Sequence, residues 1–225
     1  MLKVGVRLPA RVVDAGEYLA DVRALDAAGV DSLWLDGDGG DEPWLVLASV
    51  AAVTGVARLV VPVALGSGQA PAALAARVLT LNRLSRGRVV LFIHGASVSS
   101  DVVGAVLAVT REAKCCALLR ADTEEQARFA AREASGVVGL DGSPDRFRAA
   151  HAAVPSGQCG GAPSAFERWA RVTIPDEPAH WGTMRRDYGD AGATGLVLPS
   201  DPRLLDLLRN GDDEADRSDL QLSQG

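Results

Sequence analysis

The sequence is poor in aromatic residues and in cysteine. Phe, Trp and Tyr make up 4% of the 225 residues, so we expect a core of many small aliphatic contacts, which favours helices layered on strands. The three cysteines show no C-x-x-C spacing, which argues against a disulfide framework or a zinc site. The three histidines lie far apart without a His-Glu-x-x-His array, and the sequence therefore predicts no metal site.

Long apolar runs and an excess of positive charge are also missing. No apolar run approaches the roughly 20 residues of a membrane helix, and the first fifteen residues do not have the pattern of a signal peptide. The net charge of −6 argues against nucleic-acid binding, which needs clustered Lys and Arg. We therefore expect a cytoplasmic protein that binds neither membranes nor nucleic acid.

What is present is a regular alternation of strand and helix patterns. The predicted strands span residues 3–8, 32–36, 58–64, 88–94, 115–120, 136–140, 171–174 and 195–198. The predicted helices span residues 14–28, 43–54, 71–84, 101–112, 122–134, 144–153, 177–191 and 202–209. Eight βα units in a chain of this length predict a compact (β/α)8 TIM-type barrel, with an open doubly wound sheet as the alternative.

Several predicted helix ends carry the expected local signals. Asp122 and Glu125 are spaced as in a capping box. First-turn prolines are expected at Pro43 and Pro71, and left-handed helix ends at Gly29 and Gly192.

The chain shows no convincing domain boundary. Residues 1–210 are predicted to form one domain, and the acidic residues 211–225 a disordered tail. Residues 154–163 have the composition of a loop, followed by a predicted short helix over 164–171.

Function in a βα barrel is expected in the loops that follow the strands. After the second strand, residues 36–42 contain four carboxylates, which could bind a hard cation or supply a general base, or form an exposed turn. Asp36 and Asp38 also resemble the nucleophile and the acid/base of haloacid-dehalogenase-like phosphotransferases, but the acidic motif that binds magnesium in that family does not follow a core strand here.

Two later segments offer further candidates. His94 could donate a proton at the end of the fourth strand, or could be a packed histidine at the rim of the core. The backbone N–H groups of the next three residues could bind an anion: Gly95, Ala96 and Ser97. Gly160 and Gly161 could hold a phosphate before the predicted short helix, or belong to an ordinary loop.

The first 97 residues resemble the N-terminal half of the luciferase-like monooxygenase superfamily. The stretches that carry the resemblance are 4–9 (VGVRLP), 27–35 (AAGVDSLWL), 43–54 and 74–89, with weaker matches at 120–128 and 191–199. The resemblance implies a (β/α)8 barrel, commonly dimeric through its early helices. It also implies that FMN or the deazaflavin F420 is bound at the C-terminal mouth and acts on a small organic substrate.

The sequence departs from that family at the implied cofactor site. Gly37-Asp38 stands where members commonly carry Asp-His, and Val60-Val61 replaces a Gly-Thr pair. Phe92 and His94 occupy positions that are glycine in members, so two positions of bare backbone become large side chains. The long insertion that members carry after strand four is missing.

These observations lead to two hypotheses. The first is an oxidoreductase or monooxygenase that uses F420 or FMN, with His94 and Asp38 as catalytic residues. Its cofactor-binding residues would be Asp36, Val61, Gly95, Ala96, Ser97, Gly160 and Gly161. The alternative is a noncatalytic barrel without a cofactor that acts as a binding or partner protein.

Overall fold

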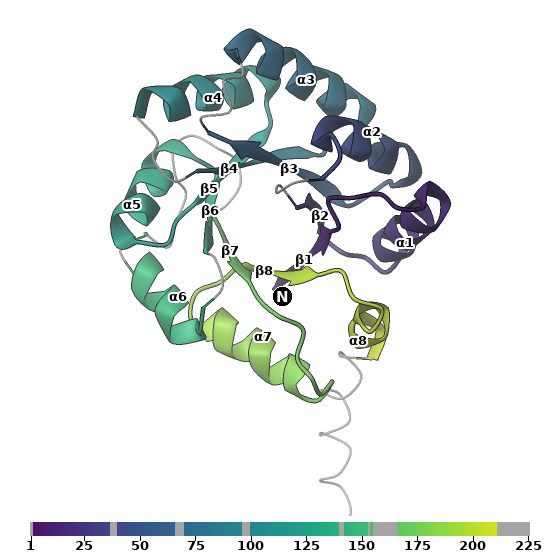
Figure 1. Cartoon of the computed structure of the whole chain (residues 1–225). Helices are drawn as coiled ribbons and strands as arrows, with labels where there is room; N and C mark the ends of the chain where they lie inside the picture. The colour runs from purple at the N-terminus through teal and green to yellow at the C-terminus, as the bar shows by residue number, and fades with distance from the viewer. Residues whose placement is uncertain are drawn as a thin grey trace, which may run out of the picture.

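The computed structural model describes residues 2–36, 40–65, 70–95, 100–139, 142–152, 154 and 166–210. Its parallel strands pair in sequence order, and the last pairs with the first, so that they close a barrel (Figure 1). The strands are β1 (Lys3–Leu8), β2 (Ser32–Leu35), β3 (Arg58–Ala64), β4 (Val89–His94), β5 (Cys116–Arg120), β6 (Gly136–Gly139), β7 (Glu167–Arg171) and β8 (Gly195–Pro199). The predicted (β/α)8 barrel is confirmed, and the open sheet is excluded.

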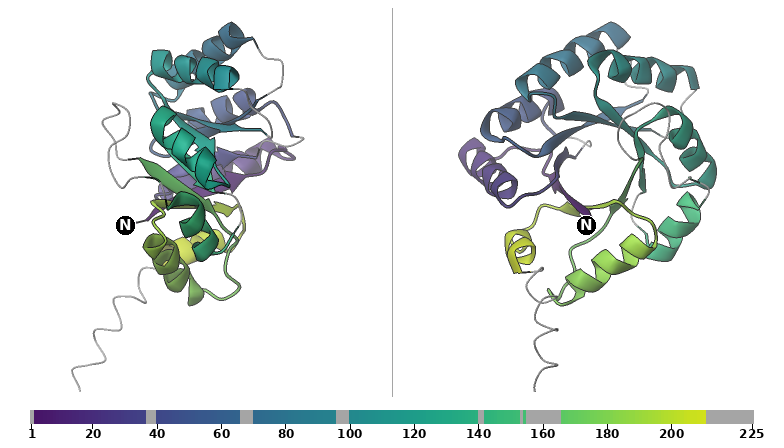
Figure 2. Two further views of the ribbon diagram at one scale, coloured as in Figure 1. Left: turned by 90° about the vertical axis from the view of Figure 1, so that its left-hand side faces the viewer. Right: turned by 180° about the vertical axis from the view of Figure 1, so that it is seen from behind.

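One helix follows each strand, and together the helices surround the barrel, as the views in Figure 2 also show. They are α1 (Ala15–Ala27), α2 (Pro43–Val53), α3 (Pro71–Leu84), α4 (Ser100–Ala113), α5 (Glu124–Glu133), α6 (Pro144–His151), α7 (His180–Asp190) and α8 (Leu204–Asn210). Over the described residues, no helix has both the length and the apolar character needed to cross a membrane.

The core has two layers because successive side chains of a strand point to opposite faces. A large aliphatic layer lies between the strands and the helices. A second cluster fills the inside of the barrel and consists of Trp34, Val60, Val90, Leu118, Val138, Trp169 and Val197, with Phe92 and Cys116 packed against it. The interior is thus a packed core rather than a pore, as expected for this fold.

Two of the four tryptophans lie inside the barrel and are accommodated by glycine. A Cβ atom on Gly195 would lie 2.5 Å from the Trp169 ring, closer than real Cβ contacts come. Gly5 faces Trp34 in the same way. Both indole N–H groups are satisfied, since Trp34 donates to Ser32 Oγ at 2.8 Å and Trp169 donates to Glu167 Oε2 at 2.9 Å.

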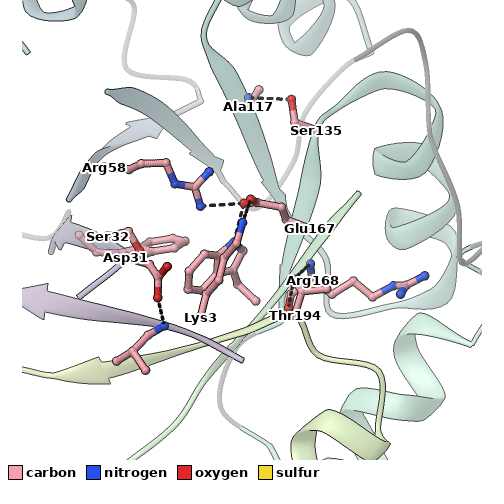
Figure 3. A network of polar contacts seen from close by, with 12 residues as sticks. Lys3, Asp31, Ser32, Arg58, Ala117, Ser135, Glu167, Arg168 and Thr194 are labelled. Atoms are coloured by element: carbon pink, nitrogen blue, oxygen red, sulfur yellow. Dashed lines mark hydrogen bonds and ion pairs between the residues drawn. The ribbon is translucent and has the colours of Figure 1, made fainter. Parts of the chain in front are cut away.

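A buried ion network closes the N-terminal end of the barrel (Figure 3). The Glu167 carboxylate accepts hydrogen bonds from Lys3 Nζ at 2.6 Å and from Arg58 Nη2 at 2.9 Å. Burial alone would raise the pKa of Glu167, but the hydrogen bonds from Arg58, Lys3 and Trp169 outweigh it and lower the pKa below its usual value. The network joins β1, β3 and β7 by charge as well as by packing.

Most predicted helix ends are confirmed. Pro43 and Pro71 lie in the first turns of α2 and α3, and Gly29 and Gly192 have φ values of 83° and 89°. The capping prediction for α5 was wrong by one residue. Thr123 is the N-cap, and its hydroxyl accepts a hydrogen bond from the Gln126 N–H at 3.3 Å.

The largest error in the predicted elements is at β7. The strand spans Glu167–Arg171, where the sequence predicted a short helix over 164–171 and a strand over 171–174. Glu167 and Arg171 are charged but face inward. The alternation of hydrophobic and polar residues predicts that charged residues face solvent, so the strand was missed. Their partners come from other strands and are not visible locally. The predicted tail, residues 211–225, lies outside the described residues.

Candidate active site at the barrel mouth

A cavity of about 130 Å³ lies at the C-terminal end of the barrel. Its lining comes from seven strands and from Asp36, which follows β2: Arg7, Trp34, Leu35, Asp36, Pro62, Phe92, His94, Arg120, Arg171 and Val197. This is the end at which βα barrels carry their active sites. The lining is mounted on strands, which hold side chains more rigidly than loops do.

Three arginines reach the mouth because they follow interior residues by two positions. Arg120 comes two residues after Leu118, and Arg171 two residues after Trp169, both of which lie in the interior cluster. Arg7 likewise follows Gly5, which faces Trp34. The pleat therefore sends three guanidinium groups to the mouth.

The charge of the mouth is unbalanced. The Asp36 carboxylate lies between two of the arginines, 3.6 Å from Arg7 Nε and 3.7 Å from Arg171 Nη2. Arg120 instead pairs with Asp122, at 2.6 Å. Three arginines thus face two carboxylates, Asp36 and Asp122, which leaves an excess of one positive charge at the mouth of a chain whose net charge is −6. Such a local excess of positive charge favours an anionic ligand.

An aromatic wall forms the side of the mouth next to β4. The rings of Phe92 and His94 stack with their centroids 5.3 Å apart and 23° between their planes. Trp34 meets Phe92 edge-on at 5.7 Å. Phe92 and His94 are half-buried, so their faces meet the cavity and not only the core.

A smaller cavity of about 30 Å³ lies beside the ends of β5, β6 and β7, against α6. His151 is buried there, and neither of its ring nitrogens has a hydrogen-bond partner within the described part of the chain. Burial lowers the pKa of His151, so its imidazole is neutral near pH 7. A cavity of this volume holds about two water molecules. The mouth is therefore the candidate for a larger ligand.

The structure brings together two of the residues proposed from the sequence. Asp36 and His94 both line the mouth. Gly95, next to His94, has a φ of 153°, and a Cβ there would lie 3.2 Å from the carbonyl oxygen of Leu65, so the backbone favours glycine. Val61 is fully buried in the layer facing the helices, and its neighbour Pro62 lines the mouth instead.

The other proposed residues lie outside the described part of the chain: Asp38, Ala96, Ser97, Gly160 and Gly161. Among the described residues, no group of three or more His, Cys, Asp and Glu side chains is arranged to hold a metal ion.

The sequence reasoning missed Arg7, Arg120 and Arg171. Each is the last or next-to-last residue of its strand, at an inward-facing position. An arginine at the end of a strand with alternating hydrophobicity can be used to predict a residue that lines the mouth. Applying this rule to Arg171 requires the correct bounds of β7.

Comparison with known proteins adds family information for the first half of the chain. A sequence model of the family described as luciferase-like monooxygenase matches residues 2–105, from β1 into α4. No curated protein matches the chain by sequence.

Solved structures resemble the whole barrel. The coenzyme F420-dependent tetrahydromethanopterin reductase from Methanopyrus kandleri is 13% identical with a TM-score of 0.70, and the match covers 93% of this chain and 97% of that one. The monooxygenase RslO1 from Streptomyces bottropensis is 14% identical with a TM-score of 0.69, covering 96% and 100%. An F420-dependent secondary alcohol dehydrogenase in complex with an F420-acetone adduct is 10% identical with a TM-score of 0.66, covering 94% and 96%. At these identities the likeness establishes the shared fold.

Proposed function

We propose that the barrel mouth binds FMN or F420 and that the protein is an oxidoreductase acting on a small organic substrate. Residues 2–105 match the sequence model of the luciferase-like monooxygenase family, which supports this proposal. The observation that carries the proposal is the mouth itself. The mouth combines an aromatic wall with an excess of arginine, and it lies at the end of the barrel where enzymes with this fold carry their active sites.

The residues present suit a flat anionic group. The nearly parallel rings of Phe92 and His94 offer a stacking face, and the excess positive charge of the mouth attracts a phosphate or an electron-rich ring edge. The cavity of about 130 Å³ is smaller than the roughly 300 Å³ at which ligand pockets usually begin, so it accommodates part of a tricyclic ring rather than all of it. When bound, a flavin or deazaflavin supplies hydride or oxygen chemistry.

The chain's own residues would then position the reactants and handle protons. His94 is the proton donor or acceptor, because its imidazole lies at the mouth and histidine is the side chain that most often serves as a general acid or base. Trp34 and Pro62 exclude water from the floor of the cavity. Asp36 holds Arg7 and Arg171 toward the opening through their shared ion pairs.

Titration of the purified protein with FMN and with F420, followed by absorbance and fluorescence, tests the binding. We expect saturable spectral changes with one of the two; no change at tens of micromolar of either would refute the proposal. His94→Gln should keep the bound cofactor and lower turnover roughly 10²- to 10⁴-fold. His180→Gln, on the exposed side of α7, is the matched control.

A second candidate is a noncatalytic barrel that binds a ligand without redox chemistry. It is favoured by the large side chains of Phe92 and His94, which narrow the mouth where a ring would lie. A protein that folds and binds neither cofactor, while still binding a small anion, would support this candidate.

We also propose that the protein forms a homodimer through its early helices. Leu45 on α2 is 70% exposed, and Val13 just before α1 is 92% exposed. Beside them, a largely apolar hollow of about 220 Å³ between α1 and α2 is lined in part by Tyr18 and Leu19. Light scattering on the native protein and on Leu45→Glu tests this, with a shift from dimer to monomer as the expected result.

A further inference from the structure

Arg7 and Arg171 enclose a carboxylate that they do not hydrogen-bond. Hydrogen bonds between a guanidinium and a carboxylate are usually about 2.7–2.9 Å long, whereas Asp36 lies 3.6 Å from Arg7 and 3.7 Å from Arg171. Within the described part of the chain, neither guanidinium group donates a hydrogen bond to any other group. Their side chains are only 30% and 20% exposed, so water reaches them incompletely. The pair therefore carries unused hydrogen-bond donors in a partly desolvated place.

The opposite end of the same barrel shows what a closed version of this arrangement looks like. There the Glu167 carboxylate accepts from Lys3 at 2.6 Å and from Arg58 at 2.9 Å, and its side chain is 10% exposed. In that network, the carboxylate is fully paired through short hydrogen bonds, so its role is structural. The pair at the mouth combines similar groups with longer distances and an opening to a cavity, which is the arrangement of a site that receives a ligand.

We propose that the mouth binds a small carboxylic acid with a flat, unsaturated or aromatic body. Its carboxylate takes donors from Arg7 and Arg171, displacing the ion pairs of Asp36, and its body lies on the apolar floor beside Trp34 and Val197.

The size of the cavity limits the class of acid. A water molecule needs roughly 10–15 Å³ of such space, so about 130 Å³ holds about ten water-sized groups. That fits a single ring or a short conjugated chain with one carboxylate, the size of benzoate. The floor, formed by Trp34, Pro62 and Val197, is largely apolar and matches such a body rather than a sugar.

Binding of this acid does not depend on a cofactor. Its assignment as the substrate class rests on the proposed function, because only an oxidoreductase would transform it. Testing the acid and the cofactor separately therefore keeps the two proposals distinguishable.

Calorimetry of benzoate binding to the full chain without a cofactor is the first experiment. Benzamide has the same shape without the charge and should bind at least tenfold more weakly; inorganic phosphate, which carries charge without a ring, should also bind more weakly. Affinity for benzoate should fall as sodium chloride is raised, because the contact is ionic. Equal binding of benzoate and benzamide would overturn the carboxylate assignment, and phosphate binding as tightly as benzoate would overturn the flat body.

Variants locate the site. Arg7→Gln and Arg171→Gln should each weaken benzoate binding tenfold or more, whereas the exposed Arg128→Gln on α5 should leave it unchanged. Asp36→Asn removes the competing carboxylate and should tighten benzoate binding severalfold. Circular dichroism confirms that each variant is folded, and unchanged binding in folded Arg171→Gln would refute the site.

The same samples are titrated with FMN and F420. If the protein binds benzoate but binds neither FMN nor F420, the proposed redox function is rejected and the acid site still stands. If the protein binds FMN or F420 but does not bind benzoate, the acid site is rejected and the proposed redox function still stands.

Discussion

Trp169 donates its indole N–H at 2.9 Å to the carboxylate of Glu167, the residue two positions earlier on β7. The two side chains share the inward face of the strand, and Glu167 also binds Lys3 from β1 and Arg58 from β3. One carboxylate thus ties three strands together at the N-terminal end of the barrel. This end has a structural role, whereas the arginine contacts at the opposite end of the barrel are longer.

Removing the charge of Glu167 should destabilise the fold. Glu167→Gln leaves Lys3 and Arg58 without their anion in a largely buried place, and breaking a buried ion pair costs about 3–5 kcal/mol. Because Lys3 is partly exposed, we expect the lower end of that range. Urea unfolding measures the loss, and Glu177→Gln, at an exposed site, should change the free energy of unfolding by less than about 0.5 kcal/mol.

The same group predicts a dependence of stability on pH. The pKa of Glu167 is lower in the folded protein than its usual value of about 4.5, so its contribution is fully present above about pH 4.5 and is lost as pH falls through the lowered value. The difference in free energy of unfolding between wild type and Glu167→Gln should therefore shrink between pH 6 and pH 3. A difference that stays constant over this range would contradict the assignment.

Gly195 should not tolerate a side chain. Its added Cβ would lie 2.5 Å from the Trp169 ring, and Trp169 is completely buried, so Gly195→Ala should destabilise by about 1–3 kcal/mol through overpacking. Gly182→Ala in α7 is the matched control, because nothing lies within 4 Å of its added Cβ. A helical position of this kind should gain up to about 1 kcal/mol on the same change. Thermal unfolding of both variants decides the matter.

Phe92 should contribute to cofactor binding as a stacking partner. Phe92→Ala removes one ring of the stacked pair, so we expect FMN or F420 to bind at least threefold more weakly, at a stability cost of about 2 kcal/mol for a half-buried ring. Fluorescence titration compares wild type and variant. Tighter binding to the variant would show instead that Phe92 narrows the mouth and obstructs the ring.

The fold was predictable because its signals are local. Alternation within strands and the prolines and glycines at helix ends located most elements to within one or two residues, as at β3 and α3, which match their predicted ranges. β7 was misplaced because its stability comes from partners distant in the chain. Glu167 pairs with residues 109 and 164 positions away, and no local pattern contains that information.

The candidate site was predictable in part. Asp36 and His94 follow from the rule that function lies after the strands, and both line the mouth. The arginines depend on which face of each strand points inward, and on a closed barrel that brings β1, β5 and β7 to one opening.

The sequence by itself determined the alternation of eight strands and helices, the early family match and the acidic net charge, because these depend on residue type and spacing. Only the tertiary structure decided that Trp34, Phe92 and Trp169 meet inside the barrel, that one end is closed by Glu167, and that Arg7 and Arg171 flank Asp36 at the other. The reason is geometric. Closure of the sheet gives every strand an inner face, and charges that look exposed along the chain become neighbours across the barrel.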